Sequence, residues 1–183
     1  MTYSLQDIFL EKSYPFEERT FKKGEYFVRD YQNNSRIGIL TKGIMRGYIS
    51  SENGEDINIL FLKETDVVTG NLVCDKPSSI NIQAIEVCKV WIADFSFLIS
   101  AIKSDNEIEM AYNSHLNNLH AKIQKRLVSL INLNALDKYL FFLKEYPNLI
   151  NRIPHYHIAN YLGITPTQLS RIRKQYVSIS QQM

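Results

Sequence analysis

The chain has 183 residues, 45% of them hydrophobic, and a formal net charge of +2 at pH 7. This length suffices for one large domain or two small ones with a buried core. No apolar run approaches the roughly eighteen residues that a membrane span needs, which argues against a membrane protein. The N-terminal sequence MTYSLQDIFLEKS lacks a basic segment followed by an apolar one, so we expect a cytoplasmic protein.

The charge is unevenly distributed along the chain. Residues 1–120 contain 12 Lys+Arg and 17 Asp+Glu, a net charge of −5, whereas residues 121–183 contain 9 Lys+Arg and 2 Asp+Glu, a net charge of +7. This asymmetry indicates that the C-terminal third meets a polyanion. A solvated basic face without a partner is the alternative.

Short strand-like segments alternate with turn residues between residues 20 and 94. A short helix is expected at residues 4–9, followed by strands at residues 26–28, 36–40, 44–50, 55–62, 81–86 and 88–93. The pair Asn53-Gly54, between two apolar segments, is the strongest hairpin signal. Many short strands separated by glycine turns predict an antiparallel barrel or sandwich.

After residue 94 the apolar period becomes helical, with helices expected at residues 95–103, about 106–133 and 136–146. The longest of them carries a narrow apolar seam. The seam consists of Tyr112, Leu116, Leu119, Ile123, Leu127 and Leu130. A helix of roughly 40 Å would overhang a small barrel, so we predict that the seam is a dimer interface. An intramolecular strip is the alternative.

The segment IPHYHIANYLGITPTQLSRIRKQY, residues 153–176, predicts two helices joined by a tight turn. Pro154 suits a first helical position, and Gly163 suits the left-handed residue that ends the first helix. Thr165 and Gln168 have the spacing of a capping box at the start of the second helix. A helix-turn-helix at about residues 154–175 is the interpretation, and an ordinary helical hairpin is the alternative.

The second helix would turn Leu169, Ile172 and Tyr176 inward and a polar, basic face outward. The candidate DNA-binding residues are Thr165, Thr167, Gln168, Ser170, Arg171 and Lys174. Such side chains suit the major groove, where Arg pairs with guanine and Gln with adenine. Arg173 lies on the flank of the inward face and should touch phosphate or the neighbouring helix.

Three segments in this order resemble the cyclic-AMP receptor protein/FNR (Crp/Fnr) family of bacterial regulators. They are FKKGEYFVRD, ILTKGIMRGYI and IPHYHIANYLGITPTQLSRIRKQ, and the last is the most specific. The resemblance covers nearly the whole chain. It implies that Arg171 reads a guanine and that Thr165 contacts a phosphate. Pro166 and Thr167 stand where the family often has other base-reading side chains, so no operator sequence is implied.

The cyclic-nucleotide-binding members of the family hold the phosphate and ribose with a Gly-Glu pair and a following Arg-Ser. Here Asn71 replaces the carboxylate, and Ser78 or Ser79 stands in place of the arginine. The candidate effector pocket therefore comprises Gly70, Asn71, Leu72, Ser78 and Ser79. Because a buried cyclic phosphate would lack its guanidinium partner, we expect a signal other than cyclic AMP.

Two other classes of protein compete with this interpretation. A metal-dependent barrel enzyme needs histidines on its strands, but His115, His120, His155 and His157 all lie outside the strand region. Cys74 and Cys88 could form a redox pair, although two buried thiols are the simpler explanation. We therefore expect no enzyme activity, catalytic residue, metal or cofactor. A ligand-sensing barrel that regulates a protein partner without binding DNA is the second alternative.

The expected fold is α+β in three parts. Residues 1–105 form an antiparallel β-roll or jelly-roll barrel of the cyclic-nucleotide-binding type, residues 106–134 a dimerisation helix, and residues 135–183 a helix-turn-helix domain. The expected function is that of a homodimeric, sequence-specific transcription regulator. Its expected partners are an approximately palindromic operator in double-stranded DNA, a second copy of the chain and RNA polymerase, with no membrane.

Overall fold

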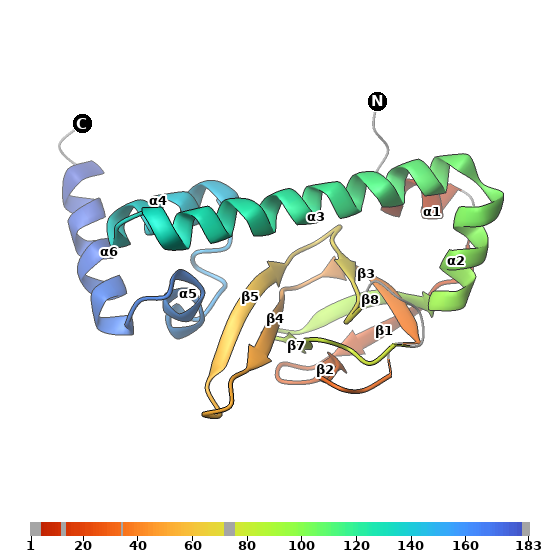
Figure 1. Ribbon diagram of the computed structural model, residues 1–183, viewed down its shortest axis with the longest axis horizontal. Helices are drawn as coiled ribbons and strands as arrows, with labels where there is room; N and C mark the ends of the chain where they lie inside the picture. Colours follow the sequence, from red (N-terminus) through yellow and green to blue (C-terminus); the bar gives the residue numbers. More distant parts are fainter. Residues whose placement is uncertain (1–4, 12–13, 34, 72–75, 181–183) are drawn as a thin grey trace. The chain divides into compact units, whose positions relative to one another are not determined.

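The computed structural model describes residues 5–11, 14–33, 35–71 and 76–180 (Figure 1). The chain forms two compact units, Met1–Leu119 (unit 1) and His120–Met183 (unit 2). The boundary lies inside the long helix α3 (Asn106–Asn132), so each unit includes one part of that helix.

Unit 1 contains two four-stranded sheets in which every pair of neighbouring strands is antiparallel. The first sheet has the order β1 (Glu17–Phe21), β8 (Cys88–Asp94), β3 (Arg36–Lys42) and β6 (Val67–Val68). The second sheet has the order β2 (Tyr26–Val28), β7 (Asn81–Ala84), β4 (Met45–Ser50) and β5 (Asp56–Leu62). The predicted antiparallel fold of the strand region is therefore confirmed.

The expected hairpin joins β4 and β5, whose register pairs Ser50 with Asp56. Gly54 in its turn has a positive φ of 78°. The strands β1 and β6 were not expected from the sequence. Four of the five residues of β1 are exposed, so it lacks the apolar alternation of a half-buried strand, and β6 has only two residues.

The space between the two sheets is filled by apolar side chains from strands of both. The cluster comprises Phe21, Val28, Leu40, Met45, Leu62, Val68, Ile82, Ala84, Cys88, Val90 and Ile92. Burial raises the pKa of the Cys88 thiol to about 11, which keeps it protonated and unreactive at neutral pH. Cys88 thus fits the buried-thiol interpretation, and Cys74 lies outside the described residues.

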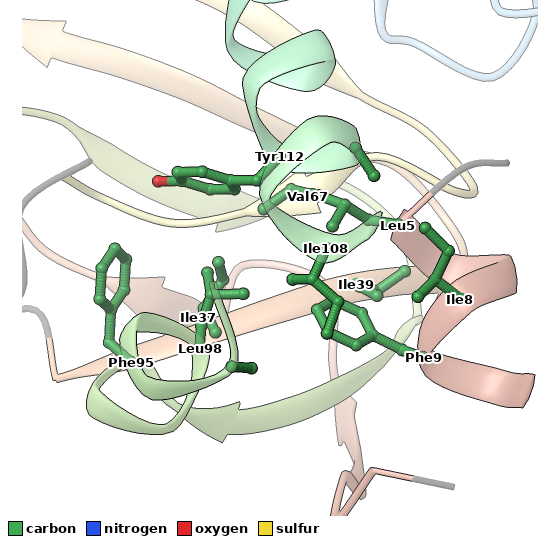
Figure 2. Close-up of a cluster of buried hydrophobic side chains, with 12 residues drawn as sticks. Leu5, Ile8, Phe9, Ile37, Ile39, Val67, Phe95, Leu98, Ile108 and Tyr112 are labelled. Atoms are coloured by element: carbon green, nitrogen blue, oxygen red, sulfur yellow. The ribbon is translucent and has the colours of Figure 1, made fainter. Parts of the chain in front are cut away.

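A second apolar cluster lies on the outer face of the first sheet (Figure 2). It joins residues of β3 and β6 to three helices, α1 (Leu5–Glu11), α2 (Phe95–Ser104) and the beginning of α3. Ile37 and Ile39 of β3 meet Phe95 of α2 and Ile108 of α3 in this cluster. Burial of these side chains stabilises the packing of the helices against the sheet.

The apolar seam predicted along α3 is therefore divided between two environments. Tyr112 is buried in this second cluster and Leu116 packs against it, so both contribute to the core of unit 1. The structure thus gives these two residues a role in packing within unit 1, and their role in a dimer interface stays a prediction. The sequence pattern could not separate the two roles, because both require the same apolar spacing.

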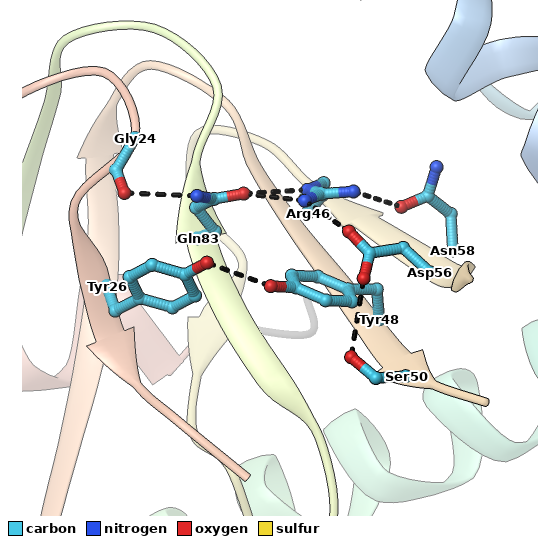
Figure 3. A network of polar contacts seen from close by, with 8 residues as sticks. All are labelled: Gly24, Tyr26, Arg46, Tyr48, Ser50, Asp56, Asn58 and Gln83. Carbon is cyan, nitrogen blue, oxygen red and sulfur yellow. Dashed lines mark hydrogen bonds and ion pairs between the residues drawn. The ribbon is translucent and has the colours of Figure 1, made fainter. Parts of the chain in front are cut away.

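The outer face of the second sheet carries a polar network instead of a helix-packed apolar cluster (Figure 3). Arg46 on β4 is buried, and its Nη2 lies 2.8 Å from the Asp56 carboxylate and 2.7 Å from Oε1 of Gln83. Its guanidinium also lies 3.9 Å from the ring centroid of Tyr48. The Tyr48 hydroxyl lies 2.9 Å from that of Tyr26 on β2, so the network crosses all four strands.

Unit 2 contains the end of α3, α4 (Ala135–Glu145), α5 (His155–Leu162) and α6 (Pro166–Ser180). The side chain of Asn134 accepts a hydrogen bond from the Asp137 amide and so caps α4. Phe142, Tyr146 and Tyr161 are all buried, and their ring centroids lie 5.2–5.9 Å apart. This aromatic trio joins α4 to α5.

Two glycines with positive φ provide a test of the packing in unit 1. A Cβ on Gly43 would lie 2.7 Å from both the Cys88 sulfur and the Val87 carbonyl oxygen, whereas a Cβ on Gly24 would meet nothing within 4 Å. Gly24→Ala should therefore lower the free energy of unfolding by about 1–2 kcal/mol, from backbone strain alone. Gly43→Ala should lower it by about 3 kcal/mol or more, because overpacking is added. Urea denaturation measures both, and equal losses would contradict the close approach at Gly43.

Candidate nucleic-acid interface

The turn between α5 and α6 is built by local interactions. Gly163 has φ 64° and ψ 36°, the left-handed conformation expected for the residue that ends α5. The Thr165 hydroxyl oxygen accepts a hydrogen bond from the Gln168 amide at 3.1 Å, and Oε1 of Gln168 accepts one from the Thr165 amide at 2.9 Å. The predicted capping box is therefore confirmed. Pro154, by contrast, precedes α5 as its N-cap and is not its first helical residue.

The orientation of α6 follows from the side chains that the two helices bury. Ile158 and Ala159 of α5 are fully buried, and Leu169 and Ile172 of α6 are buried as well. Tyr176 is half-buried, and its ring lies 5.9 Å from that of Tyr139 on α4. These contacts place one face of α6 against α4 and α5 and leave the opposite face exposed.

The exposed face carries all six predicted DNA-binding residues, namely Thr165, Thr167, Gln168, Ser170, Arg171 and Lys174. At about 100° per residue, Thr167, Ser170, Arg171 and Lys174 point to the same side of α6. Thr165 and Gln168 differ from these four, because each already uses a side-chain oxygen in the capping box.

Arg173 points away from this face and joins α6 to its neighbours. Its Nη1 contacts the ring nitrogens of His155 at the start of α5, with 2.9 Å to Nδ1. Arg173 also lies near Tyr139 on α4, where its charge opposes the rise that burial causes in the pKa of the Tyr139 hydroxyl. The sequence left open phosphate or a neighbouring helix for Arg173, and the structure shows contacts with two helices.

A further contact within unit 2, between Arg126 and Tyr161, links the end of α3 to α5 and was not expected from the sequence. Nη2 of Arg126 donates a hydrogen bond to the Tyr161 carbonyl oxygen at 3.1 Å, and its guanidinium lies 4.2 Å from the Tyr161 ring centroid. Burial lowers the pKa of Arg126 from its ordinary value. Only a pattern that paired residues 35 positions apart could have revealed this contact.

The remaining seam residues of α3 are unequally exposed. Leu119 and Leu130 are half-buried, whereas Ile123 and Leu127 are 45% and 58% exposed. Leu130 lies close to α5, since a Cβ on Gly163 would be 3.5 Å from its Cδ2. Ile123 and Leu127 therefore form the exposed part of the seam, and the nearby Val128 and Ile131 are exposed too.

The candidate effector loop is closed by its own hydrogen bonds. The Ser78 hydroxyl lies between two carbonyl oxygens that can accept its proton, at 2.5 Å from that of Ile80 and 3.0 Å from that of Gly70. Nδ2 of Asn71 donates to the Pro77 carbonyl oxygen at 2.9 Å. A Cβ on Gly70 would clash with the Ser78 hydroxyl oxygen, so the backbone at Gly70 lies directly against the Ser78 side chain. Ser79 is exposed, and Leu72 lies outside the described residues.

These residues do not fit a cyclic nucleotide. Lys76, which is exposed, is the only basic residue between positions 70 and 79. The Ser78 hydroxyl, which could otherwise face a phosphate, is buried and bonded within the loop. A buried phosphate would therefore lack a charge-assisted partner here.

Two four-stranded antiparallel sheets with packed helices, followed by a helical unit, define an α+β protein that joins an antiparallel β-domain to a small helical domain. Residues 18–105 match the family described as the cyclic nucleotide-binding domain. No curated protein sequence matches the chain. None of the helices in the described parts of the chain is long and apolar enough to cross a membrane.

Solved structures with the same fold cover most of the chain. FixK2 from Bradyrhizobium japonicum is similar with a TM-score of 0.82 and 18% identity over 91% of this chain and 87% of that protein. A CooA mutant from Carboxydothermus hydrogenoformans has a TM-score of 0.78 and 14% identity over 98% and 86% of the two chains. A protein from Eubacterium rectale, proposed as a transcriptional regulator of the Crp/Fnr family, has a TM-score of 0.69 and 16% identity over 96% and 84%.

Residues 18–105 thus match the cyclic nucleotide-binding domain family, and the chain shares the fold of FixK2, CooA and the Eubacterium rectale protein of the Crp/Fnr type. The resemblance predicted from the sequence is confirmed at this level.

The contact between His155 and Arg173 predicts a dependence of stability on pH. Burial, and then the Arg173 charge, lower the pKa of His155 from its ordinary value, so the unfolded chain binds this proton first as the pH falls. The contribution of the contact should be complete above the ordinary imidazole pKa of about 6.5 and should decline below it. His155→Gln, which keeps a neutral acceptor, should lose less stability on acidification than the wild type.

Midpoints of urea unfolding at about pH 7.5 and about pH 5.5, on either side of the ordinary imidazole pKa, measure this difference. His120→Gln, which changes an exposed histidine of α3, is the control and should behave like the wild type. If His155→Gln and the wild type lose equal stability, the contact is not sensitive to pH.

Proposed function

We propose that the protein is a sequence-specific, DNA-binding transcription regulator of the Crp/Fnr type that acts as a homodimer in the cytoplasm. The α5–α6 pair is its helix-turn-helix, and α6 is the recognition helix. The observation that carries the proposal is the face of α6 on which Thr167, Ser170, Arg171 and Lys174 lie exposed, opposite the buried Leu169 and Ile172.

The chemistry of this face suits the major groove of DNA. An arginine at the position of Arg171 can pair bidentately with O6 and N7 of guanine, and Lys174 one turn further can neutralise a phosphate. The hydroxyls of Ser170 and Thr165 suit phosphate oxygens. The net charge of +7 on residues 121–183 supports attraction to a polyanion.

The exposed apolar side chains of α3 support the homodimer. Ile123 and Leu127 lie on the predicted seam and are about half exposed, which is costly for a monomer in water. Two parallel copies of such a seam can pack as a coiled coil. A two-fold dimer would read an approximately palindromic operator whose half-sites are about 34 Å apart.

The β-roll is proposed as the sensor, with a signal other than cyclic AMP. The hydrogen bonds that close the loop at Gly70 and Ser78, together with the absence of an arginine there, support this choice. RNA polymerase is proposed as a further partner because regulators of this type act on transcription. No catalytic role is proposed for any residue.

A ligand-sensing module that docks a protein partner through its C-terminal helices is the second candidate function. It would use the same basic face without reading DNA. Gel shifts on random-sequence DNA at low and high salt distinguish the two, because a DNA-binding protein loses affinity steeply with salt. No binding at low salt would favour the docking module.

The proposed roles of the α6 residues predict two different phenotypes. Arg171→Ala should cost about 1–3 kcal/mol on the selected site and relax the preference at one base pair. Lys174→Ala should weaken binding to all sequences and reduce the salt slope by about one unit. Lys144→Ala, which removes the same charge from α4, is the control and should change the slope less.

Selection of sites from a random pool, followed by salt titrations on the selected duplex, measures both effects. If Arg171→Ala selects the same motif as the wild type with undiminished preference at every position, Arg171 contacts only the backbone.

The proposed interface predicts the oligomeric state of a double variant. Ile123→Asp with Leu127→Asp should give monomers, because each buried carboxylate would face its symmetry mate. Both side chains are exposed within one chain, so the fold should survive. Met110→Asp changes an exposed apolar residue on another side of α3 and should leave the dimer intact. A double variant that remains dimeric in light scattering would refute the assignment of this seam.

A further inference from the structure

The first turn of α6 presents two exposed side chains that cannot read a base by charge or by an amide. Pro166 is the first residue of the helix and Thr167 the second, and both are exposed. Pro166 offers only the carbons of its ring, and Thr167 offers a methyl group and a hydroxyl. A recognition helix contacts base edges with its N-terminal residues. At this end of α6 the exposed side chains are therefore small and partly apolar.

The geometry of α6 places Thr167 in line with Arg171. Four residues advance about 40° around the helix and about 6 Å along it, so Thr167 and Arg171 share one face. Leu169 and Ile172 are buried on the other side. Since base pairs are stacked about 3.4 Å apart, a base contacted by Thr167 lies within about two base pairs of the one contacted by Arg171.

The other first-turn residue, Gln168, is restricted by the capping box. Bidentate reading of adenine needs both the oxygen and the nitrogen of a glutamine amide. Oε1 of Gln168 already accepts the hydrogen bond from the Thr165 amide at 2.9 Å. The reading of bases at this end of α6 therefore falls to Thr167 and its neighbour Pro166.

Of the natural base pairs, only A·T presents an apolar group in the major groove, and that group is the C5-methyl of thymine. Threonine methyl groups can contact it. We propose that the Thr167 methyl group, flanked by the Pro166 ring, reads the methyl group of a thymine within about two base pairs of the guanine read by Arg171. This inference rests on the proposed DNA-binding function and assigns part of the half-site.

The capping box also supports the precision of this contact. The two hydrogen bonds between Thr165 and Gln168 hold the backbone on both sides of Thr167. A contact between two methyl groups depends on close approach, since dispersion falls off within a fraction of an ångström. A fixed first turn therefore favours recognition by shape.

The experiment uses the full-length protein and the duplex that it selects from a random pool. Each thymine of the half-site is replaced in turn by deoxyuridine, which lacks only the methyl group. One replacement should weaken wild-type binding about fourfold per half-site, as expected for one buried methyl group. Every other thymine should tolerate the change with little effect.

Two nearly isosteric variants separate the methyl group of Thr167 from its hydroxyl. Thr167→Val keeps the methyl group and should retain the preference for thymine over uracil. Thr167→Ser keeps the hydroxyl and should bind both duplexes equally. Lys144→Ala, on α4 and outside the proposed recognition face, is the control and should discriminate as the wild type does.

Three results would overturn the inference. The first is a wild type that binds every uracil duplex as tightly as the selected one. The second is a Thr167→Ser variant that discriminates between the thymine and uracil duplexes as strongly as the wild type does. The third is a Thr167→Val variant that binds the selected duplex more weakly while Thr167→Ser does not, which would indicate a hydroxyl contact. A chain that selects no DNA would instead refute the proposed function, and this inference with it.

Discussion

The rotation of α6 about its own axis depends on a small set of buried side chains. Leu169 and Ile172 are buried where α6 packs against α4 and α5. A helix with 3.6 residues per turn cannot bury these two side chains without exposing Thr167 and Arg171. The left-handed Gly163 and the capping box that follows set where α6 begins. The buried side chains of α6 thus decide which of its residues are exposed.

Unit 1 uses the same separation of faces in its strands. Alternation along β4 sends Met45 into the apolar interior and Arg46 to the outer face, where a charged side chain needs hydrogen-bonding partners once it is buried. Asp56 and Gln83 supply them from the neighbouring strands. The interior itself is filled by apolar side chains, and the loop at Gly70 is closed by Ser78.

The helix α3 serves different purposes along its length. Its beginning contributes Ile108 and Tyr112 to the core of unit 1, and Arg126 near its end donates to the Tyr161 carbonyl oxygen within unit 2. Between these contacts Ile123 remains exposed. An apolar seam in a long helix can therefore combine core packing with an exposed stretch, and its spacing alone does not separate the two.

Local features of this protein could be predicted from the sequence because they join residues a few positions apart. The hairpin at Asn53-Gly54, the left-handed Gly163 and the pairing of Thr165 with Gln168 are of this kind. The exposed face of α6 followed from its apolar period. The contacts of Arg46 with Gln83 and of Arg126 with Tyr161, and the burial of Tyr112, were decided only by the tertiary structure. Each joins segments that are distant in the chain, and such pairs leave no periodic signal because their positions depend on how whole elements pack.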